Sequence, residues 1–586
     1  MSSASDWDIP GEISRMGREA PSLAAFPGTS GVVWMNSDRY SLTQDGGKYH
    51  SHISMILLGE ADGVKPRRFP YPDGERAVLE VTEASLYDLE GQKLDELPVS
   101  EYDAGGIKGA EVAFPDDAGG LVAVVTWYEN VPGRYYLDDV LTFAGELPIW
   151  EQTVTVEVPD GMRVYWDGVG IGDPERVKNG RTERMTWTIL NEPAHVGTGM
   201  AGSGRPMLSF SLEHGYLAAL KKLKDLENVP YAPRIPQSVS MQKGSVFKTA
   251  GAIYRFMAAR SIPQEDGTSK VRTIDMIPPD GPWTAWEQVL IAAKWMSALG
   301  FRTQVYWEQS MPSGTDGPAS PKVWSGPVLK AADDAKKEVY YRAGYSGSPE
   351  KLPPSLYGQP LYRAGNSGIE RITLPRGSAS DHTFSQNWKV SLGEDGTVSG
   401  VLDMTLTGAW MDIFAVNTDD LSFADTAQEI LSGMIFKVPG IILNTQSVKP
   451  LGSGCRVTMS VNAAPGIVSA NSILFRLMGG IPRAFETIPA PGTKYAFRFP
   501  FVFEINSMIT TPRGYKALDL PGRSVSGDSK AMLEQSVVHW TKRARTEASC
   551  RWTVRASDID EYTSARISDQ LALVAGWPDT SVPLRK

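Results

Sequence analysis

Short runs of β-branched and aromatic residues, separated by turn signals, dominate residues 31–239 of the chain. The clearest run is residues 150–158, in which polar and apolar residues alternate strictly from Thr153 to Val158. Such alternation is typical of an antiparallel strand with one buried face. The 57 glycines and 41 prolines of the chain favour many short strands and turns over long helices. These features predict an N-terminal antiparallel β-sandwich over residues 31–239, preceded by an extension at residues 1–30.

A helical pattern replaces the strand pattern near residue 240. Residues 246–259 carry Ala, Phe and Met at helical spacing. A second helix is marked by Thr284 and Glu287, which have the spacing of a capping box, and by Gly300 as its C-cap. Residues 301–307 then read as a strand. We therefore expect a central α+β core over residues 240–372.

Strand signals return after residue 372, which predicts a C-terminal β-rich domain over residues 373–586. Its expected packed helices are residues 427–436, 530–545 and 562–575. A chain of 586 residues is longer than one hydrophobic core usually serves. The fold class is thus predicted as α+β multidomain.

Composition and charge exclude several classes of function. The net charge of −10 and the lack of a Lys/Arg-rich block argue against a nucleic-acid partner. No apolar stretch is long enough to span a membrane. Two cysteines, Cys455 and Cys550, do not make a disulfide framework, although they could pair with each other. The first residues fit both a chain whose signal peptide has been removed and a cytosolic chain.

The order of these parts resembles bacterial transglutaminase-like proteins, in which a β-sandwich precedes a papain-like transglutaminase core. The segments that carry the resemblance are residues 40–58, 84–92, 143–159, 280–307 and 352–362. The resemblance implies a bacterial protein of the periplasm or the extracellular space; a cytoplasmic location stays open.

Active members of that family begin their helix with Gly-Asp-Cys-Lys/Arg-Asp and end it with Ala-Leu-Gly-Ile/Phe. Counting back from residues 298–301 places Ala285 at the cysteine position, Trp283 at the glycine, Trp286 at the basic residue and Glu287 at the aspartate. A helix N-terminus lowers the pKa of a thiol and so supplies a thiolate nucleophile. A methyl group can neither ionise nor attack, and residues 1–454 contain no cysteine.

The family also needs a histidine on a strand after this helix. None of the six histidines lies between residues 301 and 381. The segment that resembles the histidine strand is residues 322–329, with Trp324 or Ser325 near the expected place. The resemblance therefore implies a degenerate core that lacks both nucleophile and base.

Six residues form the candidate groove of this degenerate core: Trp283, Ala285, Trp286, Glu287, Trp307 and Trp324. Core packing is favoured for Trp286. For Trp283 an exposed stacking or lid position is expected as strongly as core packing, because tryptophan at a cleft suits peptide or sugar binding.

Two further motifs have simpler interpretations. Residues 197–202 match the letters of a dinucleotide fingerprint, but no helix can follow them, so a loop is expected. His50 and His52 would share one strand face, a possible half of a metal site, yet no third ligand is identifiable. No metal and no cofactor are predicted.

These observations predict a non-catalytic binding or scaffolding protein of the bacterial cell envelope that recognises a protein, a peptide or a glycan. One alternative is a hydrolase that uses carboxylates, with Glu287 at the helix start, instead of a Cys-His dyad. Another is a structural assembly subunit. The oligomeric state and the identity of the ligand stay open.

Overall fold

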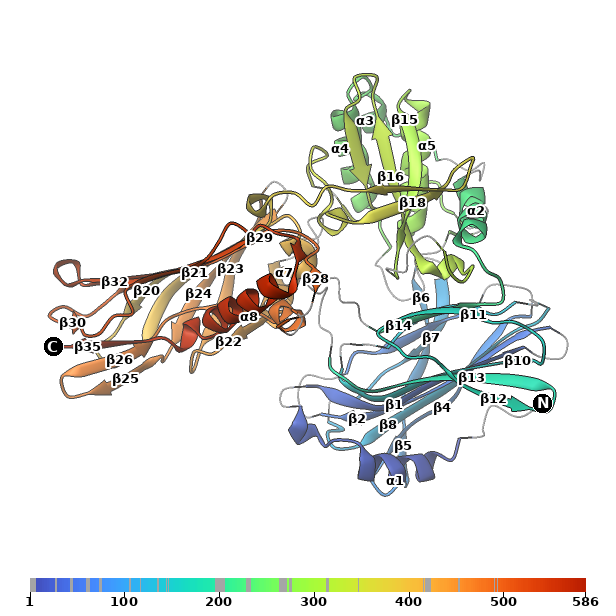
Figure 1. The fold of residues 1–586 in the computed structure, drawn as a ribbon, viewed down its shortest axis with the longest axis horizontal. Coiled ribbons are helices and arrows are strands. Elements are labelled where there is room, and N and C mark those ends of the chain that lie inside the picture. Colours follow the sequence, from blue (N-terminus) through green and yellow to red (C-terminus); the bar gives the residue numbers. More distant parts are fainter. Residues whose placement is uncertain are drawn as a thin grey trace.

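A computed structural model gives the fold. It describes residues 7–586 except 27–28, 43–45, 60–63, 73–75, 105–106, 116, 134–135, 144, 146, 195–205, 228–232, 263–270, 273–276, 312–315, 346, 415, 417–422, 452–453, 489–490 and 493. The predicted loop at residues 197–202 lies outside the described residues. The chain is multidomain and mostly sheet, and Figure 1 shows its elements in three groups that follow one another along the sequence.

The N-terminal group is built on an eight-stranded sheet in the order β12-β13-β10-β1-β2-β8-β4-β5 (Figure 1). All neighbours are antiparallel except β1 and β10, which run parallel, so the sheet is not the purely antiparallel one that was predicted. The bounds are β1 (Gly31–Leu42), β2 (Lys48–Leu58), β4 (Val78–Tyr87), β5 (Lys93–Glu96), β8 (Val122–Val131), β10 (Ile149–Pro159), β12 (Glu175–Asn179) and β13 (Thr182–Glu192).

Both faces of this sheet are covered. Val32 and Trp34 of β1 pack on one face with Ile13 of helix α1, while Val33 packs on the other face. The first 30 residues are thus partly a packed helix and not only an extension. The remaining N-terminal helices are α1 (Ile9–Glu19) and η1 (Leu23–Ala25). One three-stranded sheet consists of β11 (Tyr165–Val169), β14 (Met207–Ser211) and β9 (Asp138–Thr142). Another consists of β3 (Arg67–Pro70), β7 (Ile107–Val112) and β6 (Val99–Ala104).

The central group has a five-stranded antiparallel sheet, in the order β17-β16-β15-β18-β19, covered by helices. Its apolar core begins at Tyr216 of α2, earlier than the predicted boundary at residue 240. The bounds are α2 (Tyr216–Glu227), α3 (Gln237–Ser240), α4 (Val246–Ala258), α5 (Ala285–Ala298), β15 (Arg302–Gln309), η3 (Pro321–Val323), β16 (Trp324–Ala332), β17 (Glu338–Tyr341), η4 (Pro354–Leu356), β18 (Pro360–Ala364) and β19 (Ile369–Thr373).

The C-terminal group repeats the eight-stranded design, in the order β23-β24-β21-β20-β29-β33-β32-β31, with β20 and β29 parallel. Helix α8 is fixed on this sheet by the buried indole N–H of Trp552, which donates to the Gln570 side chain at 2.9 Å. The sheet strands are β20 (Thr383–Leu392), β21 (Val398–Thr407), β23 (Ile442–Leu451), β24 (Gly454–Ala463), β29 (Phe501–Thr510), β31 (Arg523–Gly527), β32 (Ala531–Trp540) and β33 (Arg545–Val554).

The other C-terminal elements are short. They are η5 (Ala379–Asp381), α6 (Trp410–Ile413), α7 (Phe423–Ser432), β22 (Met434–Phe436), β25 (Gly466–Ser469), β26 (Ser472–Arg476), β27 (Gly480–Pro482), η6 (Arg483–Thr487), β28 (Tyr495–Ala496), β30 (Lys516–Ala517), η7 (Thr541–Arg543), β34 (Asp558–Ile559), α8 (Glu561–Ala575), η8 (Trp577–Asp579) and β35 (Ser581–Arg585). None of the described helices has the length and apolar character needed to cross a membrane.

Two of the predicted C-terminal helices need correction. Residues 530–545 contain strand β32, whose Ala531, Leu533 and Val537 are buried at even spacing. Pairing with β31 and β33 outweighs the helix propensity of the segment, because pairing partners are not visible locally. The helix predicted at residues 427–436 is α7, which begins and ends four residues earlier. The helix predicted at residues 562–575 is confirmed as α8.

Candidate functional site

The N-terminus of α5 is capped by two residues at the helix start, Thr284 and Glu287. The backbone N–H of Glu287 donates to the Thr284 hydroxyl at 3.3 Å, and the Glu287 carboxylate accepts from the Thr284 backbone N–H at 2.9 Å. This is the predicted capping box, and it is confirmed. Ala285 follows the cap directly and is 7% exposed. The place where the resembled family carries a thiolate is therefore a nearly buried methyl group.

Glu287 has a second role that the sequence pattern did not indicate. Its carboxylate forms a two-pronged ion pair with Arg272, with Nη2 to Oε2 at 2.7 Å and Nε to Oε1 at 2.9 Å. The backbone N–H of Arg272 also donates to Oε1 at 2.9 Å. The two side chains are 1% and 7% exposed. A carboxylate buried with four N–H donors has no face open to a substrate, so Glu287 holds the chain in place.

The tryptophans of the candidate groove are mostly core residues. Trp283 is fully buried and its indole N–H donates to the Pro278 carbonyl at 2.8 Å, so the expected lid position is wrong. Trp307 and Trp324 are each 1% exposed. Only Trp286 is partly exposed, and its ring packs edge-on against Trp307 at a centroid distance of 5.0 Å.

The six predicted groove residues therefore do not line an open groove together. Three of them, Trp283, Trp307 and Trp324, are buried in one apolar core with α5. Ala285 and Glu287 are buried at the helix start. The Trp286 indole N–H is buried without a hydrogen-bond partner among the described residues. Ser325, at the point where the pairing of β16 with β15 shifts register, is exposed.

Neither cysteine can substitute for the missing nucleophile. Cys455 lies on β24 and Cys550 on β33, and both are buried, unpaired thiols. Three strands of the C-terminal sheet separate them, a distance of roughly 19 Å at the usual strand spacing, so they cannot pair. Burial raises the pKa of each thiol to about 12, which keeps both protonated near neutral pH.

No histidine takes the place of the base on β16. The nearest one along the chain, His382, is buried in the C-terminal group, where Nε2 contacts the Arg376 carbonyl at 2.8 Å. Its Nδ1 accepts from the Ala409 backbone N–H at 3.1 Å. Burial lowers the pKa of His382. Because both ring nitrogens are occupied, this imidazole is structural.

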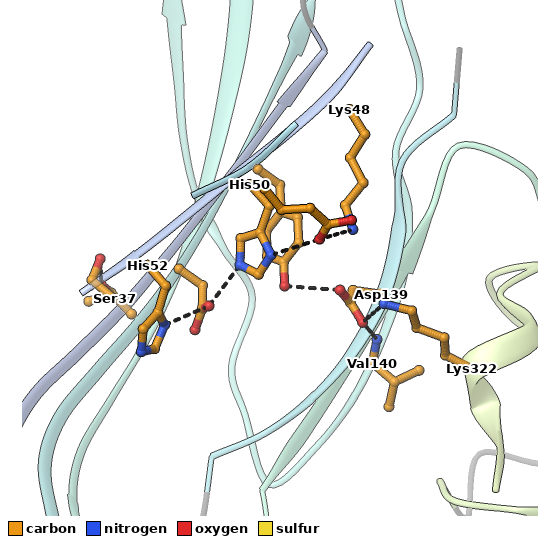
Figure 2. Close-up of polar contacts among 11 residues, drawn as sticks. Ser37, Lys48, His50, His52, Asp139, Val140 and Lys322 are labelled. Atoms are coloured by element: carbon orange, nitrogen blue, oxygen red, sulfur yellow. Dashed lines mark hydrogen bonds and ion pairs between the residues drawn. The ribbon is translucent and has the colours of Figure 1, made fainter. Parts of the chain in front are cut away.

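His50 and His52 do share a strand face, but their common partner is a carboxylate. His50 Nε2 and His52 Nδ1 each lie 2.9 Å from the same Oδ1 atom of Asp38. Dashed lines mark both contacts in Figure 2. Burial alone would raise the pKa of Asp38, but the two imidazoles outweigh it and lower that pKa. Among the described residues no group of three or more His, Cys, Asp or Glu side chains is arranged to hold a metal ion.

This cluster continues across the molecule to the central group. The Tyr40 hydroxyl donates to Asp139 at 3.0 Å, and Lys322 of η3 donates to the same carboxylate at 2.7 Å (Figure 2). The Ser320 hydroxyl donates to Asp138 at 2.6 Å. Burial alone would lower the pKa of Lys322, but the two aspartates outweigh it and raise that pKa. These contacts fix residues 320–322 on the N-terminal sheets.

Sequence reasoning missed this polar cluster almost entirely. Its only local signal was the spacing of His50 and His52, because the partners come from positions 12 to 183 residues away. Every carboxylate we find in it is paired with a cation, an imidazole or a hydroxyl. Such an arrangement holds residues 320–322 in place on the N-terminal group. It does not leave a reactive group at a surface.

Comparisons with known proteins identify a fold relative but no family. No protein-family model matches the chain, and no curated protein matches it. A solved structure of a candidate protease from Parabacteroides distasonis is similar over 95% of this chain and 99% of its own, with 14% identity and a TM-score of 0.50. At that identity the similarity describes the fold alone.

Two other solved structures are similar over smaller parts. An M1 zinc metallopeptidase from Deinococcus radiodurans covers 31% of this chain and 42% of its own, with 13% identity and a TM-score of 0.19. Leukotriene A4 hydrolase from Saccharomyces cerevisiae covers 36% and 32%, with 9% identity and a TM-score of 0.19.

Proposed function

We propose that this chain is a non-catalytic binding or scaffolding protein of the bacterial cell envelope, built on a transglutaminase-like core that has lost its nucleophile and its base. The observation that carries the proposal is the N-terminus of α5. There the capping box occupies the backbone N–H groups of Thr284 and Glu287, and Ala285 presents only a methyl group. The proposed partner is a protein, a peptide or a glycan.

The carboxylate hydrolase is less well supported. Glu287 is buried and paired with Arg272. The other carboxylate beside this region, Glu308 of β15, pairs with Arg342 at 2.7 Å. General acid–base catalysis needs one carboxyl that can hold a proton and another that is free to accept one. Two carboxylates that are each held by an arginine do not meet that requirement.

Transglutaminase activity gives the direct test. The full chain is incubated with a glutamine-donor peptide and a labelled primary amine, beside an active transglutaminase as positive control. We expect no label above background, because no thiolate stands at the start of α5. The matched variant Ala285→Cys should also remain inactive, since β16 carries no histidine to activate the new thiol. Amine incorporation by the unmodified chain would overturn the proposal.

The structural-subunit alternative predicts a different result. A protein that assembles through its sheet edges should increase in mass with concentration in light scattering. A ligand-binding protein that works as a single chain should keep one mass over the same range.

A further inference from the structure

A hollow of about 540 Å³ opens on the N-terminal group, beside β11, β12 and β13. Sites for small molecules usually have volumes of roughly 300–1,000 Å³. One wall comes from β11 and the residues before it, and a second comes from the edge strand β12 and its neighbour β13. The third wall is Gly317 and Pro318, which belong to the central group. No predicted site residue lies in this hollow.

The third wall is held in a fixed position. The backbone N–H of Gly215 donates to the Gly317 carbonyl at 2.8 Å, and the Ala319 N–H donates to the Glu213 carbonyl at 2.9 Å. A side chain at Gly317 would not fit, because its Cβ would lie 2.4 Å from the Tyr216 hydroxyl oxygen. The hollow is therefore formed before any ligand arrives, which lowers the entropic cost of binding.

The charged residues around the hollow are mostly cations. Arg163, Arg176 and Lys178 line it, against one acidic residue, Glu183. This excess of positive charge occurs on a chain whose net charge is −10, so the overall composition does not explain it. A concave surface with one sign of charge concentrates ligands of the opposite sign.

These cations are available to a ligand. Arg163 has no ion-pair partner in the described part of the chain, and its guanidinium lies over the Tyr165 ring at 4.7 Å. Arg176 reaches Glu183 only at 3.5 Å. Lys178 pairs with Asp160 at 2.9 Å, but both side chains are largely exposed, and exposed pairs contribute little. A carboxylate from a ligand can therefore replace these contacts.

Two aromatic residues, Tyr165 and Trp166, also line the hollow. The Tyr165 ring lies against the Arg163 guanidinium at 4.7 Å and the His214 ring at 4.9 Å. Trp166 is steadied by an edge-on contact with Trp187 at a centroid distance of 5.6 Å. Aromatic rings that are held in place offer a large apolar face at low entropic cost, and the C–H face of a sugar ring is a matching surface.

We infer that this hollow binds an acidic oligosaccharide, with sugar carboxylates on Arg163, Arg176 and Lys178 and a sugar ring on Trp166. The inference names a ligand class for the proposed binding function and rests on it. Arginine is suited to carboxylates because its planar guanidinium can donate two parallel hydrogen bonds.

Titration calorimetry of the full chain tests the inference with three probes. They are a galacturonic acid trisaccharide, its methyl ester, which has the same rings without charge, and a triglutamate peptide. We expect the acidic trisaccharide to bind and its affinity to fall as salt rises. The ester and the peptide should each bind at least tenfold more weakly. Arg163→Gln should lower the affinity for the acidic trisaccharide about tenfold, because it removes one charge-assisted hydrogen bond to a sugar carboxylate.

The control variant is Arg181→Gln, which removes an exposed arginine of the same group that does not line the hollow. It should bind like the unmodified chain. No heat from the acidic trisaccharide, or equal loss of affinity in both variants, would overturn the site. Tighter binding of triglutamate, lost in Arg163→Gln, would overturn the sugar as ligand class. Either result leaves the amine-incorporation test unaffected, so the two proposals fail separately.

Discussion

The buried pair of Glu287 and Arg272 allows a stability prediction that separates two costs, the loss of a helix cap and the loss of a buried ion pair. Loss of a capping residue alone costs roughly 1 kcal/mol. In the structure, however, the Glu287 carboxylate accepts four N–H groups at 2.7–2.9 Å, three of them from Arg272 and one from Thr284. Glu287→Gln keeps one acceptor oxygen, turns the other into an NH2 group that faces donors, and removes the negative charge of Glu287 from beside the buried guanidinium.

Removing one partner of a buried ion pair costs about 3–5 kcal/mol, because the other charge stays buried and unpaired. We therefore expect Glu287→Gln to destabilise the central group by about 3 kcal/mol or more. The assay is urea unfolding followed by tryptophan fluorescence, since Trp283 and Trp295 lie in the same core. Because the chain is multidomain, it can show more than one unfolding transition. The transition whose urea midpoint shifts in the variant is compared with the same transition of the unmodified chain.

Two variants make this test decisive. Glu350→Gln changes an exposed glutamate of the same group and should shift stability by no more than about 0.5 kcal/mol. The double variant Glu287→Met, Arg272→Met removes both charges and should recover much of the loss. A cost of ~1 kcal/mol or less for Glu287→Gln would mean that the capping contact alone matters and that our account of the ion pair is wrong.

Three further predictions concern the polar cluster and the cysteines. Glu129 of β8 belongs to the same cluster, since its carboxylate pairs with Lys48 at 3.2 Å. Burial would raise the pKa of Glu129, but His50 and Lys48 lower it from 4.5 to about 2, so its contribution of about 3 kcal/mol is present above pH 4.5 and lost as pH falls through 2. Glu129→Gln should therefore be destabilising in urea at pH 6 and much less so at pH 2.5. Lys322→Met should cost about 1–2 kcal/mol in urea unfolding, because Asp139 loses a partly exposed cation. Cys455 and Cys550 should not react with Ellman's reagent in the native protein and should both react in denaturant.

Each of these has a result that would contradict it. An equal effect of Glu129→Gln at both pH values would show that its charge does not stabilise the fold. Lys221→Met is the control for Lys322→Met, since Lys221 is exposed on α2, and equal effects of the two would remove the role of Lys322 in joining the groups. A fast-reacting thiol in the native chain would contradict the burial of both cysteines.

Local signals in the sequence predicted those elements whose determinants lie within a few residues. Helix α5 begins at a cap formed by Thr284 and Glu287, three positions apart, and this local hydrogen-bond pattern needs no distant partner. Residues 530–545 show the opposite case. Their composition favours a helix, yet β31 and β33 supply backbone partners on both sides, and the segment is a strand.

The sequence by itself determined that α5 carries no cysteine and that residues 301–381 carry no histidine, because the residue types of a segment do not change on folding. Only the tertiary structure decided that Cys455, Cys550 and His382 are buried in the C-terminal group and not at the start of α5. It also decided that Trp283 is a core residue, that Arg272 holds Glu287, and that His50 and His52 share one carboxylate. The physical reason is that burial and charge pairing depend on groups brought together from distant parts of the chain. The cationic hollow is the clearest example, since two of its walls come from the N-terminal strands and the third from residues 317–318.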